Sequence, residues 1–271
     1  MNDRGTAGSD KSATRSKLVA PTRRPGRPPA SEKGEISRQS IIEAALKLSK
    51  TISLQDLSIV VVARSMNVTP ALIHYYIGGR DWLTSGVMNL FYKSLLRKWP
   101  QPTGDWEEDL VAAGRRLFTH LSAYPGIAAY LVSHNRFRIF QMVGLGDRDY
   151  GVEMLERFAG IVRQAGLSPE RTGIYTHLIM DFLISTAHGT SQKLFPSEHR
   201  QFLEEKVAKL DQEKSANILF ARVSPLHLDG ALAFEEGISL FKLGLQRDRE
   251  VEGVVKGKTA RKPRKTAKVG A

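Results

Sequence analysis

The sequence predicts an all-α protein that consists of a small N-terminal helical domain joined to a larger helical domain. Apolar residues recur at three- and four-residue spacing through most of positions 37–247, as they do on the buried face of a helix. Glycine, proline and short polar runs separate these periodic segments, which is where helices end. We find no strand pair and no internal repeat in the pattern.

Composition divides the chain into four parts. Residues 1–34 are rich in Gly, Ser, Thr, Pro and Arg and have almost no large apolar side chain, so we expect a disordered basic arm. Residues 35–99 form the small domain, which ends at the proline-containing stretch 100–104. Residues 100–250 form the larger domain, and residues 251–271 form a disordered basic tail.

The net charge of +12 lies entirely in the two ends of the chain. Residues 1–40 carry nine Lys and Arg against four Asp and Glu, residues 254–271 carry seven against none, and the rest carries 24 of each. A neutral body with two basic ends favours a polyanionic partner, most simply nucleic acid. The alternative is that the charged ends only keep the protein soluble.

Cysteine is absent, which excludes disulfides, thiol catalysis and thiolate metal sites. No apolar run approaches the roughly 20 residues that span a bilayer. Residues 1–30 also lack the apolar core of a signal peptide. We therefore expect a cytoplasmic protein with no membrane partner.

The small domain begins with a helix expected over residues 37–50. Residues 57–83 then have the features of a helix-turn-helix, so the domain is a three-helix helix-turn-helix unit. Ser58 can cap the first helix of the motif, and Asn67 tolerates the left-handed backbone of the turn. Thr69 can cap the second helix and Pro70 takes its first position, where a missing N–H costs nothing. The second helix of such a motif enters a DNA major groove.

The run of β-branched residues at 59–62 would by itself prefer a strand. We expect a helix there, because the capping Ser58, the small Ala63 and the turn that follows all require one. Another helix is expected from about Arg80 to about Trp99. In the larger domain we expect helices over 105–122, 126–142, 149–165, 169–190, 197–214 and 231–247, with a less regular stretch over 215–230.

Residues 38–95 resemble the DNA-binding domain of the tetracycline-repressor (TetR) family of bacterial transcriptional regulators. The resemblance is carried by Ile41-Ile42-x-x-Ala45-Leu46, Leu57-Ser58, Val62-Ala63, Val68-Thr69-Pro70 and the aromatic end of the second motif helix. The family's turn glycine is Asn67 here, its usual lysine is Arg80, and its Leu-Tyr-x-His-Phe segment reads Ile73-His74-Tyr75-Tyr76-Ile77. Cationic and hydrogen-bonding groups are kept, whereas the base preference cannot be transferred.

The resemblance and the residues agree on a DNA interface. Thymine methyls and base edges would meet the exposed start of the second motif helix, at Thr69, Pro70, Ala71, Leu72 and Tyr75. Phosphates would be held by Ser58, His74, Tyr76 and Arg80. Arg24 and Arg27, in the Arg-Pro-Gly-Arg-Pro stretch of the arm, suit an A·T-rich minor groove. The alternative for the aromatics is packing within the domain, which we expect for Ile73 and Ile77 in any case.

The resemblance further implies a homodimer on a pseudo-palindromic operator, released by a small effector. The dimer surface would come from the 169–190 helix and the last helix, where Gly237 and Gly244 permit close helix approach. An apolar pocket would suit a hydrophobic or aromatic effector. Its candidate lining is Phe118, Tyr130, His134, Phe137, Met154, Phe158, His177 and Phe182, although such side chains are more often core.

Other functions are less well supported by the sequence. The histidines lack metal-ligand spacing, so we expect no metal and no cofactor. No nucleophile motif or phosphate-binding glycine loop is present, so we expect no enzyme. The alternative regulator is a basic architectural DNA-binding protein without ligand gating, which the lysine-rich tail would favour.

Overall fold

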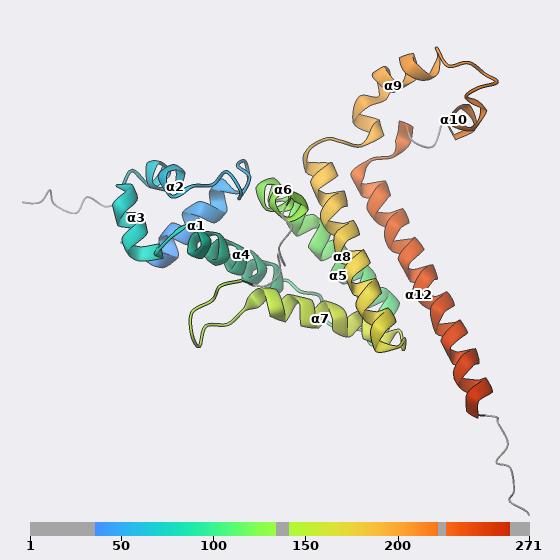
Figure 1. The fold of residues 1–271 in the computed structure, drawn as a ribbon, viewed down its shortest axis with the longest axis horizontal. Helices are drawn as coiled ribbons and strands as arrows, with labels where there is room; N and C mark the ends of the chain where they lie inside the picture. Colours follow the sequence, from blue (N-terminus) through green and yellow to red (C-terminus); the bar gives the residue numbers. More distant parts are fainter. Residues whose placement is uncertain (1–35, 134–140, 222–225, 261–271) are drawn as a thin grey trace, which may run out of the picture. The chain divides into compact units, whose positions relative to one another are not determined.

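The computed structural model describes residues 36–133, 141–221 and 226–260, which are helical and joined by turns (Figure 1). No strand occurs in these ranges, so the all-α prediction is confirmed. Within them, no helix is both long enough and apolar enough to cross a membrane.

The first four helices build the small N-terminal unit, here called the head. They are α1 (Arg38–Leu48), α2 (Ile59–Met66), α3 (Pro70–Ile77) and α4 (Arg80–Leu96). Helix α1 packs against α4, and α2 packs against α3. Each expected cap is in place: the Ser58 hydroxyl accepts from the Val61 N–H at 3.2 Å, and the Thr69 hydroxyl accepts from the Leu72 N–H at 3.4 Å.

Helix α2 forms despite the strand preference of its β-branched run. It buries Ile59, Val62 and Ala63 against the rest of the head. Asn67 ends it in the left-handed conformation, at φ 53° and ψ 51°. The cap at one end and the turn at the other therefore outweigh the local propensity, as the sequence indicated.

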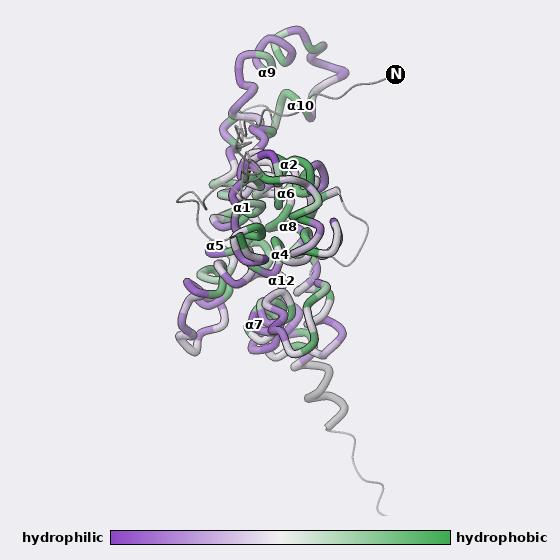
Figure 2. The backbone as a smooth tube through the Cα atoms, turned by 90° about the vertical axis from the view of Figure 1, so that its left-hand side faces the viewer, coloured by the Kyte–Doolittle hydropathy of each residue, from purple (hydrophilic) through white to green (hydrophobic). Residues whose placement is uncertain are grey.

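The remaining helices form the larger part, here called the body. Its main helices are α5 (Trp106–Ser122), α6 (Pro125–Ser133), α7 (Tyr150–Gln164), α8 (Pro169–Ser191) and α12 (Gly230–Ala260). Helix α8 packs against α5, α6, α7 and α12. Figure 2 shows hydrophobic and hydrophilic residues mixed along these helices, as expected of helices that bury one face.

Two expected helices of the body have different lengths. The segment 197–214 is broken into η1 (Pro196–His199), α9 (Arg200–Val207) and turns, and α10 (Ala216–Ala221) lies in the stretch expected to be irregular. Helix α9 buries none of its residues, so no packed face extends it. The end of the predicted 126–142 helix falls partly on 134–140, outside the described residues.

The last helix is longer than predicted, and polar contacts hold its first turn beyond residue 247. Asp248 accepts hydrogen bonds from Arg171 and from the Tyr175 hydroxyl at the start of α8. Glu252 accepts from both the Ser168 backbone and the Ser168 hydroxyl at 2.8 Å. The apolar residues at helical spacing end near residue 247, so their pattern does not predict these hydrogen bonds.

Gly237 and Gly244 serve a contact within the chain. A Cβ atom at Gly237 would lie 2.1 Å from the Phe182 ring, and one at Gly244 would lie 3.0 Å from the Tyr175 hydroxyl. Both partners are on α8, beside which α12 runs in Figure 1. The close approach that these glycines permit is therefore between α12 and α8 of one chain.

The head and the body meet at Gly126, the second residue of α6. Its N–H donates to the Ser49 carbonyl at 2.9 Å, and its carbonyl accepts from the Leu54 N–H at 3.0 Å. A Cβ atom there would lie 1.9 Å from the Ile52 carbonyl oxygen, so the two backbones touch directly. Only glycine fits this junction.

Helix α4 carries a second set of contacts to the body. The Arg116 guanidinium donates to the Ser94 and Leu95 carbonyls at 3.1–3.2 Å, which caps the end of α4. The His120 ring lies 2.9 Å from the Ser94 hydroxyl and 3.2 Å from the Phe91 carbonyl. Burial and the nearby Arg116 charge lower the pKa of His120 to about 4.

We predict that Gly126→Ala destabilises the protein by about 1–3 kcal/mol, because the added methyl group overlaps the Ile52 carbonyl. The free energy of unfolding in urea measures the effect. Gly160→Ala is the control: a Cβ there meets nothing within 4 Å, so this change within α7 should stabilise by up to about 1 kcal/mol. Equal effects of the two changes would contradict the close contact at Gly126.

We also predict that stability falls in acid because of His120. A folded-state pKa near 4 and an unfolded value of 6.5 mean that the unfolded chain binds the proton first. The stability is thus fully present above pH 6.5 and is lost as the pH falls toward 4. Between about pH 7.5 and about pH 5 the loss from this one group is about 2 kcal/mol. In His120→Gln, the free energy of unfolding in urea should fall less between these two pH values than in the wild type. An equal fall in the two proteins would contradict the lowered pKa of His120.

Candidate DNA interface and effector cavities

Helix α3 has one buried face and one exposed face. Ile73 and Ile77 are at most 5% exposed and anchor the helix on the head, as the sequence indicated. Tyr75 is 82% exposed and Tyr76 is 37% exposed. The two rings meet edge to face with centroids 5.3 Å apart, which restricts both. The helix therefore presents an ordered aromatic surface to solvent.

The candidate base contacts share this exposed side or the start of the helix. Thr69, Pro70 and Ala71 are exposed and Leu72 is half-buried. Proline at the first helical position and the Thr69 cap fix the direction in which the chain enters α3. The structure thus brings these four residues together with Tyr75 on one helix of two turns.

The candidate phosphate contacts differ in how free they are. His74 is exposed on α3. Ser58 is half-buried and its hydroxyl already caps α2. Arg80 is exposed at the start of α4, and its guanidinium donates to the Gln55 carbonyl. Arg24 and Arg27 lie outside the described residues.

The aromatic candidates for an effector pocket are core or surface residues in this structure. Met154 and Phe158 are fully buried. Phe118 and Phe182 are half-buried and face α12, where Phe118 stacks on Phe234 at 4.9 Å. Tyr130 is half-buried against the core.

The two histidine candidates do not mark a cavity either. His177 has a 75% exposed side chain 3.2 Å from Asp181. His134 lies outside the described residues, as does Phe137. Among the described candidates, none lines any of four cavities of about 270–660 Å³ between the described residues.

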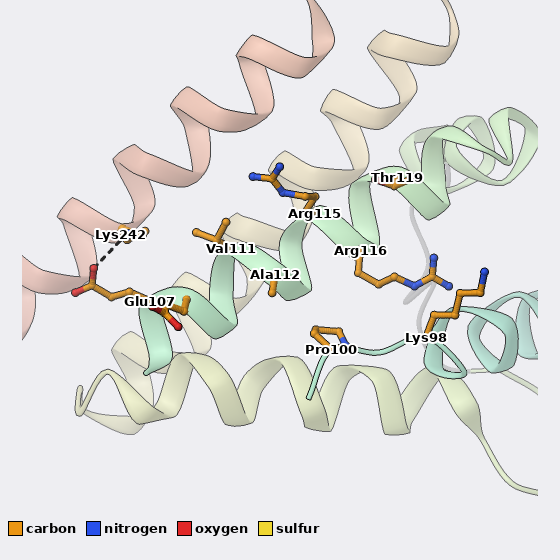
Figure 3. A pocket seen from close by; sticks show the side chains of 10 residues that line it. Lys98, Pro100, Glu107, Val111, Ala112, Arg115, Arg116, Thr119 and Lys242 are labelled. Atoms are coloured by element: carbon orange, nitrogen blue, oxygen red, sulfur yellow. Dashed lines mark ion pairs between the residues drawn. The ribbon is translucent and has the colours of Figure 1, made fainter. Parts of the chain in front are cut away.

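The largest of these cavities is a groove of about 660 Å³ on the outer side of α5 (Figure 3). It runs between the end of α4, the face of α5 and one residue of α12. Its lining is Lys98, Pro100, Glu107, Glu108, Val111, Ala112, Arg115, Arg116, Thr119 and Lys242. None of these residues was predicted from the sequence, because the expected pocket was lined mainly by aromatic side chains. The available signal was the recurrence of polar residues along one face of α5 at helical spacing.

The chain matches a known protein family. The family described as "Tetracyclin repressor-like, C-terminal domain" matches residues 100–247. Comparison with curated proteins gives no significant match.

Several solved structures from Streptomyces coelicolor are similar. Apo ActR is 19% identical, with a TM-score of 0.66 over 80% of this chain and 98% of ActR. The regulator SCO7222, a TetR protein, is 16% identical, with a TM-score of 0.62 over 79% of this chain and all of that one (100%). ActR in complex with actinorhodin is 20% identical, with a TM-score of 0.64 over 78% of this chain and 96% of ActR.

At these identities the structures establish a shared fold, an N-terminal helix-turn-helix followed by a helical body. The family match covers more than half of the chain, and members of this family are transcriptional regulators rather than enzymes. The chain therefore belongs to the tetracyclin repressor-like family and is a transcriptional regulator.

Proposed function

We propose that the protein is a homodimeric repressor that binds a pseudo-palindromic operator through α3 and is released by a small effector. The observation that carries the proposal is the exposed aromatic face of α3, with Tyr75 82% exposed opposite a buried Ile73. A monomeric globular protein rarely leaves an ordered, largely apolar surface of this kind without a partner.

Readout of the operator follows from the exposed groups. The start of α3 enters the major groove, where Pro70, Ala71 and Leu72 meet thymine methyls and Thr69 and Tyr75 reach base edges. His74, Tyr76, Arg80 and Ser58 hold phosphates and set the register. The basic arm with Arg24 and Arg27 adds minor-groove contacts, and the basic tail adds salt-sensitive affinity for any sequence.

Dimerisation is best supported by α8 and α12. Ile174 and Leu178 on α8, and Leu240 and Leu243 on α12, are between 40% and 68% exposed. Helical spacing puts all four on the side of the α8–α12 pair that faces away from α5. A second copy that covers this surface would be related to the first by a two-fold axis, and so would its recognition helix.

Effector coupling would act through the contacts between head and body. A ligand that binds the body and favours one position of α4 also favours one spacing of the two α3 helices. The head follows because Gly126 ties it to α6, and because Asn89 of α4 bonds to the Arg148 carbonyl and to the Tyr150 N–H. Bound ligand then changes the affinity for DNA by the same factor by which bound DNA changes the affinity for the ligand.

One alternative has a specific observation in its favour. Residues 254–271 carry seven cations and no acid, which suits a DNA-binding architectural protein without ligand gating. Selecting preferred DNA from a random pool at moderate salt separates the two. A two-fold symmetric enriched site supports the repressor, whereas no enriched sequence supports the architectural protein.

Tyr75→Ala should relax base preference and cost about 1–3 kcal/mol of discrimination between the selected site and a site with one altered base, because the ring reaches base edges. Fluorescence polarisation with the two DNA duplexes measures this. Phe220→Ala, which removes an aromatic ring that is 92% exposed in α10, is the matched control and should leave discrimination unchanged. Unchanged discrimination in Tyr75→Ala would exclude Tyr75 from readout.

Leu240→Glu should convert the dimer into a folded monomer and weaken operator binding about tenfold or more, because two charges per dimer would be buried. Analytical ultracentrifugation gives the mass, and circular dichroism checks the fold. The control Ile218→Glu changes a residue of similar exposure in α10 and should remain dimeric. A dimeric Leu240→Glu variant would rule out this face.

A further inference from the structure

The two ends of the groove on α5 carry side chains of opposite charge. Its α5 residues recur every three or four positions from Glu107 to Thr119, so they form one face of the helix about 18 Å long. Acidic residues lie at the start of this face and cationic residues toward its end. Between them lie the small apolar side chains Val111 and Ala112, with Pro100 opposite.

The acidic end is largely neutralised within the chain. Glu107 lies 3.2 Å from the Lys242 ammonium (Figure 3). It also accepts a hydrogen bond from the Gln246 amide at 2.6 Å. Glu108 is exposed to solvent. This end of the groove therefore offers a ligand little net charge of either sign beyond that of Glu108.

The cationic end has charge available for a ligand. Lys98 is exposed and makes no ion pair with the described residues. Arg115 is bound to Glu235 at 2.8 Å, but both side chains are about half exposed, so water screens the pair and a ligand can compete for it. In Figure 3 the Arg116 and Lys98 side chains extend toward the same end of the groove.

Arg116 links the groove to α4. Its guanidinium lines the groove and at the same time holds the Ser94 and Leu95 carbonyls at the end of α4. These carbonyls are neutral acceptors, whereas a carboxylate or sulfonate forms a charge-assisted pair that is roughly twice as strong. An anion beside Arg116 would therefore compete directly with the cap of the helix that connects head and body.

We propose that this groove is the effector site, and that it takes an amphipathic organic anion whose apolar part rests on Val111, Ala112 and Pro100 and whose acid group meets Lys98 and Arg116. When Arg116 releases the carbonyls of α4 and pairs with the ligand, the end of α4 loses its cap. Ligand binding thereby changes the position of the head. The inference rests on the proposed function for its second step only. It differs from the aromatic interior expected from the family resemblance, where Met154 and Phe158 are fully buried.

The size and lining of the groove fit this ligand class. A volume of about 660 Å³ accommodates a molecule of two or three rings with a shell of water. A long apolar ligand without charge would leave the Lys98 ammonium without an anionic partner. A small inorganic anion would leave Val111 and Ala112 uncovered.

A matched pair of fluorescent probes tests the site on the full chain. 8-Anilinonaphthalene-1-sulfonate is an amphipathic anion, and N-phenyl-1-naphthylamine has the same rings without the sulfonate. We expect the sulfonate to bind once per chain and at least about tenfold more tightly than the neutral probe. Lys98→Gln should weaken only the sulfonate, by about fivefold.

Two tryptophan variants show where the probe binds. Ala112→Trp fills the groove from an exposed position on α5 and should abolish sulfonate binding. Ala208→Trp adds the same ring at an exposed position after α9 and should leave binding unchanged. Equal binding of the two probes, or full sulfonate binding to Ala112→Trp, would overturn the site.

Operator affinity in saturating sulfonate probe tests the coupling. We expect wild type and Lys98→Gln to lose at least about fivefold in operator affinity, because linkage acts once the site is full. Arg116→Gln should lose little, since the exchanging group is gone. Saturation without an effect in wild type, or an undiminished effect in Arg116→Gln, would overturn the coupling. A chain that selects no operator at all would instead reject the proposed function, and the probe pair would still decide whether the site exists.

Discussion

The backbone contact at Gly126 joins head and body directly, and even a methyl group in place of its hydrogen would prevent it. Two hydrogen bonds of 2.9 and 3.0 Å join α6 to the turn that follows α1, with no side chain between them. Side-chain contacts adapt by changing rotamer, whereas backbone groups shift only when their helices shift. A displacement of α6 is therefore passed to the head as a movement of its main chain.

The head could be predicted closely from the sequence because its determinants are local. Ser58, Asn67, Thr69 and Pro70 each act on backbone groups within four residues, and each does what its chemistry dictates. The partition of α3 into buried Ile73 and exposed neighbours also followed from spacing alone. Whether those neighbours contact DNA remains a prediction.

The body was predictable in class but not in its functional detail, because the relevant contacts join distant residues. The extension of α12 depends on Glu252 meeting Ser168, which is 84 positions away in the sequence. Gly126 reads as an ordinary helix breaker until Ile52 is placed against it. The groove on α5 is lined by residues as far apart in the sequence as Lys98 and Lys242, and no spacing rule brings such residues together.

The shortness of α3 has a consequence for how the head tolerates change. A helix of eight residues is too short to persist in water by itself, so its order comes from the two isoleucines that it buries and from its capped ends. The proposed recognition of DNA by α3 would thus require that the entropy of ordering this helix be lost beforehand, through packing in the head. A substitution in the buried part of the head, far from any base, would therefore let α3 lose its order in the free protein. DNA binding would then have to order the helix again, so the affinity for DNA would fall before the fold as a whole unfolds.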